Sequence, residues 1–231
     1  MSKSKPSTTN NEAIEAQATK TTNDKQVSMQ FLRRRYFMIV KLLTSTQNIH
    51  DMEYNAALAA LTCHANTDKD FVPSEVLTNI IKKGHESVLE HINLTYRIEG
   101  LSRACLQELA RHRHISLSVE STRHTVRKQL KHTYYIDYLH KEWLNTTFSF
   151  ILFADKHTDM SNDELKYFIP EFWPTNLILT SNIRELRYIL KLRTAPEALK
   201  EFRDLAHYLF EVVPDEFKYL LKDCVHEEVT Q

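Results

Sequence analysis

The chain has 231 residues, of which 42% are hydrophobic and 26% charged, so it is long enough and apolar enough to bury a substantial core. Its 30 basic and 30 acidic residues give a formal net charge of zero, which argues against binding to nucleic acid or membranes through overall charge. A site for an anion must therefore be a local cluster of basic side chains.

Glycine and cysteine are both scarce. The two glycines, Gly84 and Gly100, are too few for a loop that holds phosphate through its backbone, so a bound nucleotide would have to be held by side chains. The three cysteines stand far apart and form no Cys-x-x-Cys pair. This pattern predicts reduced thiols rather than disulfides or a cysteine zinc site at Cys63, Cys105 and Cys224.

The N-terminal segment predicts neither a membrane anchor nor a folded element. Residues 1–30 are polar and contain no aromatic residue, so we expect a disordered tail followed by one domain over residues 31–231. No apolar run approaches the roughly 18 residues that cross a bilayer, and no signal-peptide core is present. We therefore expect a cytoplasmic protein that does not associate with membranes.

A strand and two helices are predicted next. The apolar run 36–43 predicts a strand. Residues 51–65 are rich in Ala and Leu and predict a helix that is capped near Asp51. A shorter helix is predicted over residues 73–83, because this segment begins with proline and is followed by Gly84.

Residues 85–91, H-E-S-V-L-E-H, have two interpretations. Ser87 and Glu90 have the spacing of a helix capping box, which would give both a structural role. His85, Glu90 and His91 suggest a metal site, but the inverted zinc motif needs H-x-x-E-H, and four residues separate His85 from Glu90 here. We therefore predict no metal site.

A strand, a turn and a helix lead to the most unusual stretch of the chain. Apolar and polar residues alternate over 92–99, which predicts a half-buried strand, and Gly100 is predicted to turn the chain into a helix over 101–110. Residues 111–123 then read R-H-R-H-I-S-L-S-V-E-S-T-R. Because arginine carries fixed donors that suit phosphate and carboxylate, this stretch is predicted to hold an anion.

The remaining elements are mainly helical. The aromatic-rich segment 125–165 predicts two helices whose aromatic side chains pack in a core, and Pro170 and Pro174 predict a loop. Residues 180–193 begin with capping residues and predict a helix with one apolar and one basic face. A final helix is predicted over 197–211.

Three motifs, in this order, resemble those of one family. They are G-H-E-S-V-L-E-H at 84–91, R-H-R followed seven residues later by Ser121, and N-I-R-E-L-R-Y-I-L-K-L-R at 182–193. Over about residues 35–214 the chain resembles the flavin-dependent thymidylate synthases, whose signature is R-H-R-x7-S. The resemblance implies an α+β fold, with a mixed or antiparallel sheet flanked by helices, that assembles as a homotetramer.

The resemblance also implies a reaction. FAD would be reduced by NADPH, and a one-carbon unit would pass from methylenetetrahydrofolate to dUMP, giving dTMP. In this family no enzyme cysteine attacks the uracil ring. The scarcity of glycine agrees with arginine side chains that grip the flavin phosphates.

Site residues follow from the resemblance by position. Arg193 would favour ionised uracil N3, and Ser121 and His85 would complete the catalytic set. The FAD site would comprise Ser87, Glu90, Arg111, His112, Arg113, Asn182, Arg184 and Tyr188. The dUMP site would comprise Glu108, Arg111, Ser121, Thr122, Arg123, Lys166 and Arg193.

Several positions depart from the family pattern, and two alternatives stay open. The departures include Glu108, Val119, Lys166 and Tyr188, so one alternative is a homologue that has lost activity. The other is a nucleic-acid-binding module that uses the Arg/His cluster, although zero net charge disfavours it. Flavin retention without turnover would indicate the first, and strongly salt-dependent oligonucleotide binding would indicate the second.

Overall fold

The computed structural model describes residues 38–65, 70–130 and 141–227, which fall into two compact units. The larger unit comprises the described residues of Phe37–Ser121 and Glu171–Gln231, and the smaller unit comprises those of Thr122–Pro170. The predicted N-terminal tail lies outside the described residues, as do three aromatic residues of the predicted core segment, Tyr134, Tyr135 and Tyr138.

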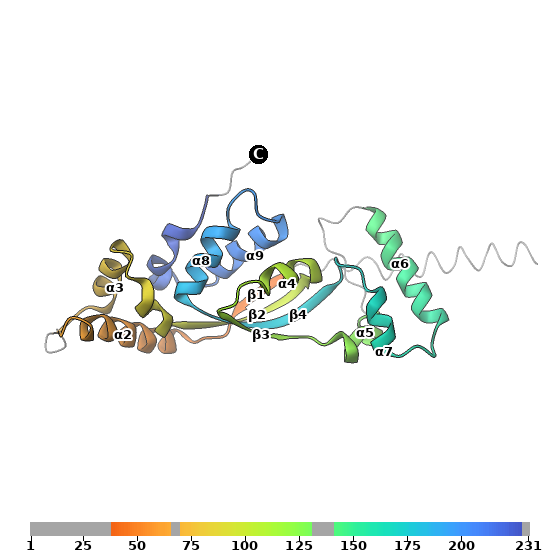
Figure 1. The fold of residues 1–231 in the computed structure, drawn as a ribbon, viewed down its shortest axis with the longest axis horizontal. Coiled ribbons are helices and arrows are strands. Elements are labelled where there is room, and N and C mark those ends of the chain that lie inside the picture. Colours follow the sequence, from red (N-terminus) through yellow and green to blue (C-terminus); the bar gives the residue numbers. More distant parts are fainter. Residues whose placement is uncertain (1–37, 66–69, 131–140, 228–231) are drawn as a thin grey trace, which may run out of the picture. The chain divides into compact units, whose positions relative to one another are not determined.

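A four-stranded antiparallel sheet forms the centre of the larger unit, within the described residues (Figure 1). The strand order is β1-β2-β4-β3. The two central strands are paired from Asn93 opposite Asn182 to Ser102 opposite Pro174. The predicted α+β fold is confirmed, and its sheet is antiparallel. The strands are β1 Ile39–Leu42, β2 Asn93–Ser102, β3 Ile115–Val119 and β4 Pro174–Asn182.

Strand β2 continues through Gly100, so the turn predicted there is wrong. Gly100 has a φ of +78°, and the register against β4 shifts between Ile98 and Leu101, so the strand absorbs the glycine as an irregularity. The Gly100 N–H donates to Asn176 Oδ1 at 3.1 Å. The following helix, α4, is therefore shorter than predicted and spans Arg103–Leu109.

The sequence did not predict β3 or β4. Strand β3 lies inside the polar stretch 111–123, where Ile115 and Leu117 are half-buried and the serines between and after them are exposed. Pro174 was expected in a loop, but proline is tolerated as the first residue of a strand. The helix predicted over 180–193 begins three residues too early, because those residues complete β4.

The helices before β2 follow the prediction with shifted ends. Helix α2 spans Thr46–Thr62 rather than beginning near Asp51, because Ser45 is its N-cap and accepts a hydrogen bond from the Asn48 N–H at 3.2 Å. Helix α3 spans Pro73–Lys82 and is followed by Gly84 with a φ of +71°, as predicted. The 3₁₀ helix η1, Glu86–His91, then leads into β2.

The core of the larger unit lies between the sheet and its helices. Figure 1 shows α4, α8 and α9 on one side of the sheet. Leu94, Tyr96 and Ile98 are buried on one face of β2, whereas Arg97 on the other face is exposed, as the alternation predicts. Helix α9 is three residues shorter at its start than predicted. The C-terminal elements are α8 Ile183–Arg193, α9 Lys200–Glu211, η3 Asp215–Leu220 and η4 Lys222–Cys224.

The smaller unit is helical, with Phe150 buried on α6. Arg127 on α5 donates hydrogen bonds to the carbonyl oxygens of His157 at 3.0 Å and Met160 at 2.7 Å, which ties α5 to the segment after α6. Throughout the described residues, no helix has the length and apolar character needed to span a membrane. The elements are α5 Thr122–Leu130, α6 Lys141–Lys156, α7 Asn162–Leu165 and η2 Lys166–Phe168.

Candidate active site

A cavity of about 700 Å³ lies beside α8 in the larger unit. Asn182, the N-cap of α8, accepts a hydrogen bond from the Glu185 N–H at 2.8 Å and so fixes where the helix begins. Arg184, Tyr188 and Lys191 then follow at helical spacing and line the cavity. The other lining residues are Ile81, Glu86, Glu90, His114, Asn182, Glu185, Arg187, Asp223 and Cys224.

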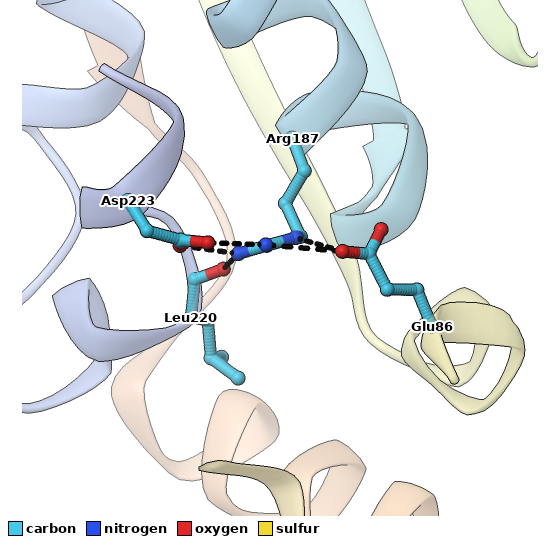
Figure 2. A network of polar contacts seen from close by, with 4 residues as sticks. All are labelled: Glu86, Arg187, Leu220 and Asp223. Atoms are coloured by element: carbon cyan, nitrogen blue, oxygen red, sulfur yellow. Dashed lines mark hydrogen bonds and ion pairs between the residues drawn. The ribbon is translucent and has the colours of Figure 1, made fainter. Parts of the chain in front are cut away.

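Arg187 connects three segments that line this cavity (Figure 2). Its Nη1 and Nη2 donate to the Asp223 carboxylate at 2.7 and 2.6 Å, and its Nε donates to Glu86 at 3.1 Å. Nη1 also donates to the Leu220 carbonyl at 2.6 Å. Burial alone would lower the pKa of Arg187, but the hydrogen bonds to Asp223 and Glu86 raise it above its ordinary value. A permanently charged guanidinium therefore joins α8 to η1 and to the C-terminal segment.

Glu90 of η1 pairs with Arg184 of α8 at 2.5 Å. The capping box expected of Ser87 and Glu90 is wrong, because η1 has His85 as its N-cap and no side-chain capping hydrogen bond. His85 and Ser87 are both exposed. Nowhere in the described part of the chain do three or more His, Cys, Asp or Glu side chains gather as a metal site would require.

A second cluster centres on His112, whose side chain is 3% exposed. Its Nδ1 lies 3.2 Å from Glu185 Oε1, and its Nε2 accepts a hydrogen bond from Arg193 Nε at 3.2 Å. The rings of Tyr188 and Phe202 meet the imidazole edge to face. Burial lowers the pKa of His112 below its ordinary value of 6.5, so the ring is neutral near pH 7.

Arg193 is held by this cluster in one orientation. Besides its bond to His112, Nη1 donates to Glu108 Oε2 at 3.1 Å, and the guanidinium carbon lies 4.6 Å from the centre of the Phe202 ring. The Arg193 side chain is 15% exposed. A fixed cation with little surrounding water can stabilise negative charge that develops on a ligand.

Arg111 and Arg113 flank His112 in the sequence, and both are exposed. They lie in the turn between α4 and β3, and the next residue, His114, lines the cavity. Neither arginine makes an ion pair with a residue in the described ranges. Their exposed guanidinium groups can be reached by an anionic ligand from solvent.

The residues predicted to bind dUMP are divided between the two units. Glu108, Arg111, Arg193 and Ser121 belong to the larger unit, whereas Thr122, Arg123 and Lys166 belong to the smaller one. Within the smaller unit, Arg123 Nε and Nη2 donate to the two carboxylate oxygens of Asp163 at 2.8 and 3.0 Å. This exposed arginine thus holds a carboxylate in the two-pronged geometry that also suits phosphate.

All three cysteines are free, as predicted. Cys63 is exposed, whereas Cys105 and Cys224 are buried. Burial raises the pKa of both buried thiols, which keeps them protonated near pH 7 and weakens them as nucleophiles.

Three charged residues of these clusters were missed by the sequence analysis: Glu86, Glu185 and Arg187. Arg187 lies four residues after Ile183 and three before Leu190, so it sits on the apolar stripe of α8 where a charge needs a buried partner. That spacing could have identified Arg187 as a buried charge from the sequence. No sequence pattern marks Glu86 or Glu185, because their partners are distant in sequence.

Comparisons with known proteins identify the family of this chain. The family model described as thymidylate synthase complementing protein matches residues 41–217. The flavin-dependent thymidylate synthase of Campylobacter jejuni strain RM1221 is 36% identical over 184 residues, which cover 72% of this chain and 86% of that protein. The chain belongs to the flavin-dependent thymidylate synthase family. The resemblance drawn from its motifs is therefore confirmed.

Two relatives from Helicobacter pylori support the same assignment. The flavin-dependent thymidylate synthase of strain J99 is 40% identical over 160 residues, which cover 61% of this chain and 76% of that protein. The crystal structure of thymidylate synthase X from Helicobacter pylori, with FAD and dUMP, aligns with a TM-score of 0.69 and 31% identity. That alignment covers 83% of this chain and 100% of the other.

Proposed function

We propose that the chain converts dUMP to dTMP, with methylenetetrahydrofolate as the carbon donor and FAD, reduced by NADPH, as the hydride source. One structural observation supports this most strongly. Four residues that the resemblance assigned to FAD line one cavity: Glu90, Asn182, Arg184 and Tyr188. Tyr188 also contacts the cluster that holds Arg193. A relative that aligns over most of the chain holds FAD and dUMP in its crystal structure.

The donor chemistry of the described residues suits FAD. The cavity lining supplies guanidinium, ammonium, imidazole and amide donors, and the carboxylates of Glu86, Glu90 and Asp223 are already paired with arginines. Flavin phosphates could therefore be held by side chains in place of a glycine-rich loop. When bound, FAD would supply the redox chemistry. The residues that would donate hydrogen bonds to the flavin phosphates are Arg111, Arg113, His114, Asn182, Arg184 and Lys191.

Arg193 is the residue we assign to the uracil ring. Two of its nitrogens are engaged by His112 and Glu108, while Nη2 has no partner among the described residues and can donate to a ligand. A cation fixed beside N3 would stabilise the ionised ring and so make it a better nucleophile. The ring is thereby activated without a cysteine.

The dUMP phosphate would be held by Arg123, assisted by Thr122, Ser121 and Lys166. The Arg123 fork already holds the carboxylate of Asp163, and phosphate would take the place of that carboxylate.

We also propose a homotetramer. Large apolar side chains on α8 and α9 are exposed, and a partner subunit would cover them: Tyr188, Leu192 and Tyr208.

Turnover by the purified protein tests this function. The protein is incubated with FAD, NADPH, dUMP and methylenetetrahydrofolate, and dTMP is measured by chromatography, with each component omitted in turn. We expect dTMP only in the complete mixture, and a loss of about 100-fold or more for Arg193→Ala. Arg97→Ala, on an exposed strand position, is the matched control and should retain activity. Equal activity of Arg193→Ala and the control would contradict the role of Arg193.

A further inference from the structure

The hydrogen bonds of His112 define which ring nitrogen carries its proton. Arginine donates hydrogen bonds and accepts none, so the bond from Arg193 Nε requires His112 Nε2 to be unprotonated. The single proton of the neutral ring is then on Nδ1, where it is donated to Glu185 Oε1 at 3.2 Å. Glu185 thus selects the tautomer that accepts from Arg193.

We infer that Glu185 is a positioning residue for the reaction, acting through His112 to orient the Arg193 guanidinium. The inference rests on the proposed function for the role of Arg193. It also gives His112 a different task from the flavin contact that the sequence suggested, because both ring nitrogens are already engaged inside the protein.

The Glu185 side chain is not needed to form its helix. Asn182 caps α8 through the Glu185 backbone N–H, so a substitution of the side chain leaves that hydrogen bond in place. The side chain is 10% exposed and approaches His112 Nδ1. The buried carboxylate accepts a hydrogen bond from the neutral imidazole, and the ligand-binding arginine lies on the opposite side of the ring. This arrangement fixes the tautomer.

Protonation of His112 would undo this arrangement. A doubly protonated ring cannot accept from Arg193 and would place a second cation beside it. The charged groups that face His112 are Glu185 and Arg193 from α8 and Glu108 from α4, and its other neighbours are the rings of Tyr188 and Phe202. Activity should therefore fall on the acid side, below about pH 6.5, as His112 becomes charged.

Glu185→Gln gives the principal test. Turnover is measured from pH 5 to 9 with saturating FAD, and rates are expressed per flavin-loaded molecule. We expect kcat/KM to fall about 10- to 100-fold, since a misplaced guanidinium costs that order of rate. The Glu185 carboxylate raises the pKa of His112. Removing this carboxylate should therefore move the acid limb of the pH profile, where activity falls as His112 is protonated, to lower pH. Glu185→Asp keeps the charge and should restore the wild-type acid limb.

A matched control uses another buried glutamate of the same unit. Glu53 is 8% exposed and accepts a hydrogen bond from Tyr219 Oη at 2.6 Å, away from Arg193, so Glu53→Gln should leave kcat/KM and the acid limb unchanged. Wild-type kcat/KM and an unmoved acid limb in folded Glu185→Gln would overturn the inference. So would an equal effect of the two substitutions, because that would indicate only a structural role.

Nitrogen NMR of the wild-type imidazole gives a second measurement that does not depend on turnover. The His112 signals are assigned by their absence in His112→Asn. A protonated Nδ1 and a bare Nε2 near pH 7.5 support the inference, and the opposite tautomer overturns it. If wild-type protein makes no dTMP, the proposed function fails by itself, while the tautomer is still decided by this spectrum.

Discussion

Replacing Arg187 with methionine should destabilise the larger unit markedly. The substitution keeps most of the side-chain volume but removes the donors that reach Glu86, Asp223 and the Leu220 carbonyl (Figure 2). Two segments that line the cavity, η1 and the C-terminal segment, would then lose their common partner on α8. The effect should appear in the free energy of unfolding and in the affinity for FAD.

The magnitude follows from the exposure of the three charges. Removing one partner of a fully buried ion pair costs about 3–5 kcal/mol, because the other charge stays buried. Arg187 is 5% exposed, but Glu86 and Asp223 are 30% and 51% exposed and would regain part of their hydration. We therefore expect a loss of about 2–4 kcal/mol, which corresponds to roughly 4–16 °C in melting temperature for a chain of this size.

Urea unfolding followed by circular dichroism, without and with saturating FAD, measures this loss. The matched control is Arg97→Met, because Arg97 pairs with Glu99 at 2.6 Å but is 57% exposed, so its loss should be below about 1 kcal/mol. If Arg187→Met and Arg97→Met lose the same stability, the network has no special role and the reasoning is refuted.

Three further predictions concern thiols, pH and the smaller unit. Cys105→Ala should keep dTMP formation while losing about 1–2 kcal/mol of stability, because the thiol is buried and no thiolate takes part. The hydrogen bond from Arg187 holds the pKa of Asp223 below its ordinary 3.8, so its stabilisation is present above about pH 4 and is lost as pH falls through the lower value. Between pH 3 and 6, urea unfolding should therefore show that the free energy of unfolding falls less on acidification in Asp223→Asn than in wild type. Asp163→Asn should change the melting temperature little, since its pair with Arg123 is exposed.

Each of these has an outcome that contradicts it. Folded, flavin-loaded Cys105→Ala without turnover would require a thiol in the mechanism. Identical acid sensitivity of wild type and Asp223→Asn would mean that the Arg187 pair contributes nothing to stability. A fall of more than about 1 kcal/mol in Asp163→Asn would show that the exposed pair supports the smaller unit.

Local patterns predicted the elements whose residues alternate or cap clearly. Residues 92–99 alternate strictly, and the structure confirms the strand. Prediction failed at Gly100 because a glycine with positive φ can bend a strand as well as end it, and only pairing with β4 decides between the two. Strand β3 was missed because its alternating residues are serines inside a basic stretch that suggested ligand binding.

The site was predictable only where family motifs marked it. The resemblance placed Glu90, Asn182, Arg184 and Tyr188 in one group, and the structure brings them to one cavity. Glu185 could not be assigned in this way, because its partner His112 is 73 residues away and the pair exists only after folding. The contacts of all the assigned residues with FAD and dUMP, these four included, stay predictions.

The central claim, that one site holds the flavin and dUMP, is tested most directly by anaerobic absorbance spectroscopy. Purified protein loaded with FAD is mixed with NADPH in the presence and absence of dUMP, and the visible flavin band is followed in time. We predict that the band bleaches and that dUMP changes the rate of bleaching in wild type. Arg193→Ala should bleach at one rate regardless of dUMP. A wild-type protein that binds no FAD, or whose flavin is reduced at a rate independent of dUMP, would contradict the claim.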